Sequence, residues 1–207
     1  MSGLRKLKKN GSKGGGAIAA AIVILLLLTA ALGYALWRRL IPTRLFLPLD
    51  YKEELLDSAH EYGLEPCLVA AVINTESSFK KDAVSVDGAE GLMQLLPSTA
   101  EWIAAMRGVG YDEQKLFEPG YNIDMGCWLL RYLSDRYGST RYALIAYNAG
   151  HGRLESWLAN EEYLDENGEL AVIPYGETDA YVKKVERAME QYKELYGEEL
   201  ENAKDDQ

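Results

Sequence analysis

The chain has 207 residues and a formal net charge of −10, and its length fits one folded domain with an appendage. Residues 1–44 hold eight Lys or Arg and no Asp or Glu, so residues 45–207 carry a net charge of −18. The negative charge of this part argues against nucleic acid as a partner, because contacts to phosphate groups need Lys and Arg.

The metal-binding and redox residues are few and scattered. Cys67 and Cys127 stand sixty residues apart, His60 and His151 are also distant, and there is no Cys-x-x-Cys pair. We therefore expect no metal and no cofactor. Both cysteines lie in apolar segments, where a free Cys usually packs as a small hydrophobe. A disulfide between them is the alternative if the domain lies outside the cytoplasm.

The N-terminal part has the pattern of a membrane anchor. Residues 1–16 are basic and Gly-rich, and residues 17–37 form an uncharged run that would span about 30 Å as a helix. Five basic residues precede the run and three follow it closely, which predicts a cytoplasmic N-terminus and an extracytoplasmic domain. We expect a single-pass cell-membrane protein with a cytosolic tail at 1–16 and a short stalk at 38–49. A cleaved signal peptide is the alternative, although Arg38 and Arg39 are a poor context for cleavage.

Residues 50–197 are predicted to form a mainly α-helical domain, followed by an acidic tail at 198–207. Asp50 and Glu53 resemble a capping box at the start of the first helix. Asn167-Gly168 favours the centre of a type I′ turn in a small hairpin within 162–174. The expected helices are 50–62, 66–76, 97–106, 122–137, 140–146, 154–158 and 178–197, with a break at 147–153 and loops at 80–90 and 109–121.

Glu76 has an unusual place in its predicted helix. Pro66 suits the first helical position, and Val69, Val72 and Ile73 mark an apolar face. Glu76 lies seven, four and three residues beyond these three, so it continues the same face. Burial of a carboxyl group raises its pKa, and a carboxylic acid still protonated near neutral pH can act as a general acid.

Four segments, taken in order, resemble the lytic transglycosylases of the soluble-lytic-transglycosylase (SLT) type, lysozyme-like enzymes that cut peptidoglycan glycan strands. Each segment alone is weak evidence, but four in the same order are specific, and together they span most of residues 50–195. The resemblance implies an α+β lysozyme-like fold that is mainly helical. The segments are Glu76-Ser77-Ser78-Phe79, Gly91-Leu92-Met93-Gln94, Ala146-Tyr147-Asn148-Ala149-Gly150 and Glu177-Thr178-Asp179-Ala180-Tyr181-Val182.

The resemblance implies a reaction with one catalytic carboxyl group, that of Glu76. Glu76 would protonate the glycosidic oxygen between N-acetylmuramic acid and N-acetylglucosamine, while the substrate's acetamido group stabilises the developing cation. Glu76 would then deprotonate the muramyl C6 hydroxyl, which attacks C1 and gives a 1,6-anhydromuramyl end without water. Ordinary glycosidases need two carboxylates, and the sequence offers no evident second one.

The same resemblance implies the contacts to the sugar chain. Ser85 would orient the acid and the sugar, Met93 and Gln94 would line the cleft, Tyr147 would lie near the acid, and Asn148 would bind an acetamido group. Without the family, Ser85 would be an ordinary loop serine and Asn148 part of a helix stop.

The last segment matches the family less closely. Glu177 is expected to organise the cleft through hydrogen bonds, and its simpler role is an acid in a first helical turn. Tyr181 completes the motif, or serves only the core. Asp179 and Ala180 stand where many relatives carry an arginine and a polar residue, which affects the surface near the cleft.

Three other functions remain as alternatives. A goose-type lysozyme would activate water with further carboxylates, but Asp82, Asp87 and Glu90 lie in a polar loop and read as solvated. A membrane-anchored wall-binding protein could have kept the cleft and lost turnover. An enzyme with little activity until a cell-envelope complex recruits it would combine catalysis with binding to a partner.

Overall fold

The computed structural model describes residues 14–40 and 47–202, which fall into two units that are treated separately. The first unit contains helix α1 (Gly14–Leu40). Its stretch Ile18–Leu36 has a mean hydropathy of 2.5 and no buried residue, so it is long and apolar enough to cross a membrane by length and composition. The predicted span 17–37 lies inside α1. Of the predicted tail at 1–16, residues 14–16 belong to α1 and residues 1–13 lie outside the described residues.

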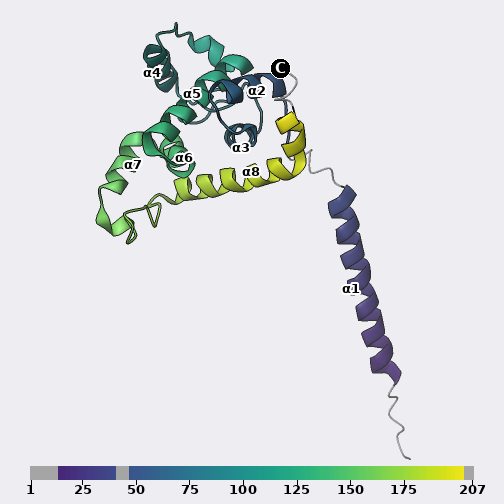
Figure 1. The fold of residues 1–207 in the computed structure, drawn as a ribbon. Helices are drawn as coiled ribbons and strands as arrows, with labels where there is room; N and C mark the ends of the chain where they lie inside the picture. Colours follow the sequence, from purple (N-terminus) through teal and green to yellow (C-terminus); the bar gives the residue numbers. More distant parts are fainter. Residues whose placement is uncertain (1–13, 41–46, 203–207) are drawn as a thin grey trace, which may run out of the picture. The chain divides into compact units, whose positions relative to one another are not determined.

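The second unit is built from helices, as predicted (Figure 1). Its described residues contain no named strand and three isolated antiparallel bridges. The elements are α2 (Lys52–Glu61), α3 (Pro66–Glu76), α4 (Pro97–Arg107), η2 (Glu113–Phe117), α5 (Pro119–Tyr137), α6 (Thr140–Ala149), α7 (His151–Leu158), η3 (Glu161–Tyr163) and α8 (Gly176–Asn202).

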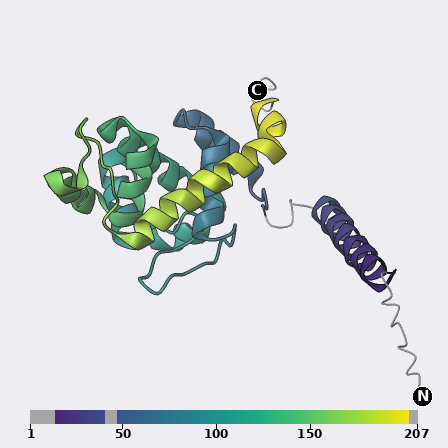
Figure 2. The same ribbon diagram turned by 90° about the horizontal axis from the view of Figure 1, so that it is seen from below.

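Helix α3 lies at the centre of this unit. Every side chain from Cys67 to Ile73 is buried, so the helix is apolar on all sides and not only along the predicted stripe. Helix α8 packs along it, as the two views of the long yellow helix show (Figures 1 and 2). Cys67 and Cys127 are both buried free thiols, so the alternative of a disulfide is not realised.

Several helix ends agree with the prediction because local residues determine them. Pro66 and Pro97 begin α3 and α4, and Gly108 and Gly138 end α4 and α5 in the left-handed conformation. Ser139 caps α6, where its hydroxyl oxygen accepts a hydrogen bond from the Tyr142 N–H.

Other ends differ from the prediction. The expected capping box at Asp50 is wrong, because Tyr51 is the N-cap of α2, with φ 56° and no side-chain cap. Helix α5 begins at Pro119 instead of 122, and only Gly150 separates α6 from α7, so the break at 147–153 is too wide. Helix α8 continues through Gly197 to Asn202 because buried Leu200 holds its last turns against the core.

The residues predicted as a stalk divide between the two units. Residues 38–40 belong to α1, and residues 41–46 lie outside the described residues. Leu47 is buried, and the carbonyl oxygens of Leu47 and Pro48 accept hydrogen bonds from Tyr196 (2.9 Å) and Tyr192 (2.6 Å) on α8. The folded domain therefore includes residues 47–49, which the prediction had assigned to the stalk.

Two hairpins without regular strands have the same hydrogen-bond pattern. We name residues 83–91 the cleft hairpin and residues 163–171 the outer hairpin. In the cleft hairpin the bonds are Ser85 N–H to Ala89 O, Gly88 N–H to Ser85 O and Gly91 N–H to Ala83 O; in the outer hairpin they are Asp165 N–H to Glu169 O, Gly168 N–H to Asp165 O and Ala171 N–H to Tyr163 O.

Each hairpin is closed by a three-residue loop that ends in a glycine with φ 79°, Gly88 or Gly168. A small hairpin within 162–174 is therefore present as a single bridge, Leu164 to Leu170. The predicted type I′ turn is wrong, because Asn167 does not have the positive φ that such a turn requires.

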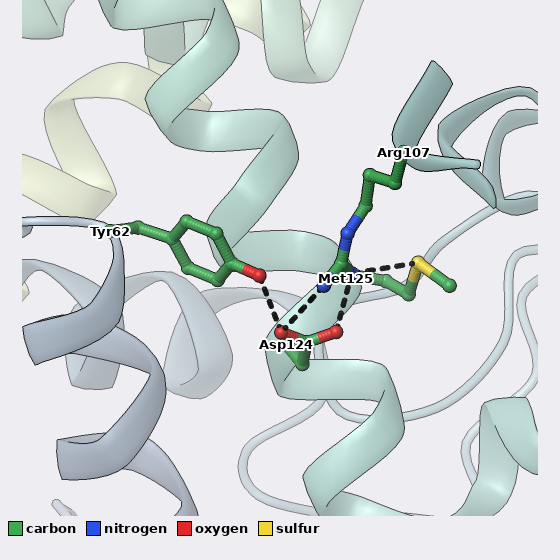
Figure 3. A network of polar contacts seen from close by, with 4 residues as sticks. All are labelled: Tyr62, Arg107, Asp124 and Met125. Carbon is green, nitrogen blue, oxygen red and sulfur yellow. Dashed lines mark hydrogen bonds and ion pairs between the residues drawn. The ribbon is translucent and has the colours of Figure 1, made fainter. Parts of the chain in front are cut away.

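A polar network joins three helices away from these hairpins (Figure 3). The Asp124 carboxylate on α5 accepts a hydrogen bond from the Tyr62 hydroxyl (2.6 Å) and pairs with the guanidinium group of Arg107 at the end of α4. Burial and the Asp124 carboxylate raise the pKa of Tyr62. The network therefore holds the ends of α2 and α4 against α5.

Candidate active site

One cavity of about 270 Å³ brings together six of the eight side chains predicted for the site. They come from the end of α3, the cleft hairpin and the turn after it, the end of α6 and the start of α8. The six are Glu76, Ser85, Gln94, Tyr147, Asn148 and Glu177.

Glu76 is the last residue of α3, where the helix leaves the core and opens into the cavity. Burial raises the pKa of its carboxyl group to about 7, and the Tyr181 hydroxyl and the Lys184 charge oppose this rise. The Lys184 ammonium group is held nearby by donating a hydrogen bond to the Thr75 carbonyl (3.1 Å). Near neutral pH, Glu76 is therefore present in both the protonated and the ionised form.

Two tyrosine hydroxyls lie beside this carboxyl group. The Tyr147 hydroxyl donates a hydrogen bond to the Met93 carbonyl (2.8 Å). The Tyr181 hydroxyl is buried without a hydrogen bond of standard geometry, but it is close enough to lower the Glu76 pKa. Burial and the Glu76 charge raise the pKa of both tyrosines well above the ordinary value. Both hydroxyls therefore keep their protons at neutral pH.

Ser85 and Gln94 use part of their hydrogen-bonding capacity to shape the cavity wall. The Ser85 hydroxyl oxygen accepts a hydrogen bond from the Ala89 N–H (2.9 Å), which leaves its proton to donate. The Gln94 amide nitrogen donates to the carbonyls of Ala83 (3.1 Å) and Gly91 (2.9 Å). Its carbonyl oxygen remains as an acceptor.

Asn148 is oriented by a residue that the sequence analysis had not selected. Buried Thr178 donates a hydrogen bond from its hydroxyl to the Asn148 side-chain oxygen (2.8 Å). This leaves the Asn148 NH₂ group to donate toward a ligand, as recognition of an acetamido oxygen requires.

Met93 and Glu177 differ from their expected places. The Met93 side chain is fully buried and does not line the cavity, so Met93 contributes its backbone carbonyl instead. Glu177 lies exposed at the cavity, and among the described residues its side chain makes no hydrogen bond. No hydrogen bond among the described residues therefore supports the predicted organising role of Glu177.

The cavity also contains a carboxylate that was read as solvated. Asp87 lines the cavity together with Glu76 and Glu177. Asp87 and Glu177 are exposed, whereas Glu76 is mostly buried. The exposure of Asp87 agrees with the prediction that it is solvated. Because Asp87 nevertheless lines the cavity, the number of carboxylates does not by itself exclude a hydrolase.

A second cavity of about 610 Å³ shares Leu96, Thr99, Leu129, Tyr147 and Asn148 with the first and extends the cleft along α4. Trp102 and Tyr132, whose rings meet edge to face at 5.3 Å, line this extension. A larger cavity of about 720 Å³, between α2, the start of α3 and the end of α8, contains none of the predicted site residues.

The family model described as "Transglycosylase SLT domain" matches residues 55–169. The soluble lytic murein transglycosylase of Salmonella typhimurium is 34% identical over 146 residues, covering 67% of this chain and 22% of the relative. The membrane-bound lytic murein transglycosylase C of Actinobacillus pleuropneumoniae is 35% identical over 175 residues, covering 73% and 47%.

Solved structures agree. The 70 kDa soluble lytic transglycosylase of Escherichia coli superposes with a TM-score of 0.66 at 32% identity, over 73% of this chain and 25% of that one. An inactive glutamate-to-glutamine mutant of the Pseudomonas aeruginosa lytic transglycosylase Slt gives the same values. The chain thus spans about a fifth to a half of the length of these proteins. Since the family model covers more than half of the sequence, the chain belongs to the transglycosylase SLT domain family.

Proposed function

We propose that this chain is a membrane-anchored lytic transglycosylase that cleaves the β-1,4 bond between N-acetylmuramic acid and N-acetylglucosamine in peptidoglycan. The observation that carries the proposal is the mostly buried Glu76 carboxyl group, with a pKa of about 7, at the floor of a cleft in an SLT domain. The inactive Pseudomonas aeruginosa mutant, in which a glutamate is replaced by glutamine, supports a catalytic glutamate in this family.

Protonated Glu76 would donate its proton to the glycosidic oxygen, so that the bond from this oxygen to muramyl C1 breaks. The acetamido group of the muramyl residue would stabilise the charge that develops at C1. Ionised Glu76 would then take the proton of the muramyl C6 hydroxyl while the oxygen of that hydroxyl forms a bond to C1. The proton returns to Glu76, and the product ends in a 1,6-anhydro ring. A pKa near the working pH suits a group that acts first as an acid and then as a base.

The surrounding side chains have matching tasks. Tyr147 and Tyr181 keep neutral hydroxyls beside Glu76. The Tyr181 hydroxyl can donate to the ionised form of Glu76, whereas the Tyr147 hydroxyl donates its proton to the Met93 carbonyl. The Ser85 hydroxyl and the Asn148 NH₂ group would donate to the reacting sugar, the latter to an acetamido oxygen. The Gln94 oxygen would accept a hydrogen bond from a sugar hydroxyl, and Glu177 would form hydrogen bonds at the rim of the cleft.

Helix α1 would anchor this domain in the cell membrane as a single-pass segment, with a cytoplasmic N-terminus and an extracytoplasmic domain. Its length and apolar composition support the anchor, and the Actinobacillus pleuropneumoniae relative is named as membrane-bound. The excess of basic residues before the span supports the orientation.

The test is a digest of purified peptidoglycan by the full chain in detergent, analysed by mass spectrometry. We expect anhydromuramyl products from the wild type and none from Glu76→Gln, which keeps the shape of the side chain and cannot cycle a proton. Asp87→Asn and Glu177→Gln are matched controls that remove the other two carboxylates of the cleft. Both controls should still give anhydromuramyl products.

Two outcomes would change the proposal. Products that are heavier by one water and have reducible muramic ends, together with loss of activity in Asp87→Asn, would make the protein a hydrolase. Retained binding to the wall without products from any form would make it a wall-binding protein or an enzyme that needs a partner.

A further inference from the structure

Asn122 is a fully buried polar residue in the second turn of α5, and no motif of the sequence analysis contains it. Its side-chain oxygen accepts a hydrogen bond from the Met93 N–H (2.7 Å). Its side-chain NH₂ group donates to the carbonyls of Glu90 (3.0 Å) and Leu116 (2.8 Å). The backbone partners fix the orientation of the amide, because an N–H can only donate and a carbonyl can only accept.

The turn at Gly91–Gln94 is shaped to receive this amide. A Cβ atom at Gly91, which has φ 77°, would lie 2.3 Å from the Asn122 side-chain nitrogen and 2.2 Å from the Leu116 carbonyl oxygen. One helical turn after Asn122, Gly126 leaves room for the Met93 side chain, whose sulfur would lie 2.3 Å from a Cβ atom there. Helix α5 therefore holds Met93 by both its backbone and its side chain.

The same turn makes contacts with the neighbours of the reacting carboxyl group. The Met93 carbonyl accepts the hydrogen bond of Tyr147, whose pKa responds to the charge of Glu76. The Leu92 carbonyl accepts a hydrogen bond from the hydroxyl of Ser77 (2.8 Å), the residue after Glu76. Asn122 thus fixes one side of Met93, and Tyr147 binds the other side.

We propose that Asn122 is a positioning residue for the reaction assigned to Glu76, which it serves by holding the Gly91–Gln94 turn so that Tyr147 stays beside that carboxyl group. The inference rests on the proposed function for its kinetic consequence. Asn122 does not line the cavity, so its effect on the reaction passes through the turn that it holds.

The test compares Asn122→Ser with Tyr62→Phe in the full chain in detergent. The serine is neutral and too short to bridge three backbone groups. The control removes a hydrogen bond to Asp124, two residues further along α5 and away from the turn (Figure 3). Circular dichroism first establishes that both variants are folded at the assay temperature.

We expect kcat on peptidoglycan to fall about tenfold or more in Asn122→Ser, with a smaller change in KM, because displaced catalytic groups mainly slow the chemical step. In Tyr62→Phe both constants should stay within about twofold of the wild type. Equal kcat losses in the two variants, or a kcat within about twofold of the wild type in Asn122→Ser, would overturn the inference.

A second readout needs no turnover, so it separates this inference from the proposed function. The Glu76 carboxyl titration, followed by carbon-13 NMR, should shift by about half a unit or more in Asn122→Ser and stay unchanged in Tyr62→Phe. An unchanged titration in both variants would overturn the inference even if the wild type is active. A wild type without anhydromuramyl products would instead reject the proposed function alone.

If Asn122→Ser does not fold, Asn122→Asp replaces it. Aspartate keeps the volume and the acceptor for the Met93 N–H, but its ionised form faces two carbonyls. The ratio of its kcat to that of the wild type should rise as the pH falls, because protonation restores one donor. A ratio that is near one at every pH would overturn the inference.

Discussion

The cleft hairpin and the outer hairpin are the same turn in two different surroundings. Each has one backbone bridge and a three-residue loop. In each, a side-chain oxygen before the loop, that of Ser85 or Asp165, accepts a hydrogen bond from the backbone N–H four residues later. The cleft hairpin continues into the Gly91–Gln94 turn, where buried Asn122 holds the backbone. The outer hairpin is mostly exposed. Local sequence therefore makes the turn, and the packing behind it decides whether the turn can serve a site.

The largest expected effect separates three glycines that all have a positive φ. Gly91→Ala should destabilise the protein by about 4 kcal/mol and abolish activity, because the new Cβ meets backbone and a buried amide in addition to the left-handed strain. Gly88→Ala and Gly168→Ala meet open space and should each cost about 1 kcal/mol. Urea unfolding measures all three, and similar losses would show that the two hairpins do not differ as described.

The two regions should respond to pH in opposite directions. The folded-state pKa of Glu76, about 7, lies above its ordinary value of 4.5, so its contribution to stability is complete below 4.5 and is lost as the pH rises through 7. Glu76→Gln should therefore be more stable than the wild type by about 3 kcal/mol at pH 8, with little difference at pH 4.

In the outer hairpin, backbone N–H groups of Glu169 and Asn167 lower the pKa of Asp165. Its stabilising contribution is present above the ordinary value of 3.8 and is lost as the pH falls through the lowered pKa. Asp165→Asn should therefore be less stable than the wild type at pH 7, and this difference should shrink in acid. Thermal unfolding across pH measures both variants, and parallel pH profiles would contradict the comparison.

The smallest effect comes from a pair of tyrosines on α6, one for each hairpin region. Tyr147 donates to the Met93 carbonyl, whereas Tyr142 accepts from the Leu170 N–H (2.9 Å) and donates to Glu169 (2.6 Å). Tyr147→Phe should cost about 1.5 kcal/mol, because a buried carbonyl loses its donor, and should lower kcat.

Tyr142→Phe should cost about 0.5 kcal/mol and leave kcat unchanged, because its partner Glu169 is exposed and water can replace that hydrogen bond. Urea unfolding and peptidoglycan digestion on the same preparations give the free energy of unfolding and kcat of each variant. An equal kcat loss in the two variants would show that the outer hairpin also takes part in the reaction.

The sequence predicted features that depend on nearby residues and missed those that depend on distant ones. Proline and glycine located the ends of α3 and α4, since their backbone preferences act locally. The capping box at Asp50 and the end of α8 at Gly197 were wrong because tertiary packing decides both.

In the site, the four motifs contain five of the six predicted side chains that line the cavity, and Ser85 is the one outside them. They did not indicate that Met93 turns inward, that Thr178 orients Asn148, or that Asn122 holds the turn. These contacts join residues about 30 positions apart, and no local pattern specifies them. The only indication in the sequence was that Asn122 is followed four residues later by Gly126 on a predicted helix with apolar positions, which places a polar and a small residue on one face of α5.

The hydrogen bond between the Met93 N–H and Asn122 has a consequence for the timescale on which the cleft opens. An amide bonded to a fully buried side chain can exchange with solvent only when α5 separates from the turn, which requires opening of much of the core. The Leu170 N–H, bonded to a tyrosine near the surface, needs only a local fluctuation. The wall of the cleft would therefore keep its shape through many turnovers, whereas the outer hairpin would need only a local fluctuation to open.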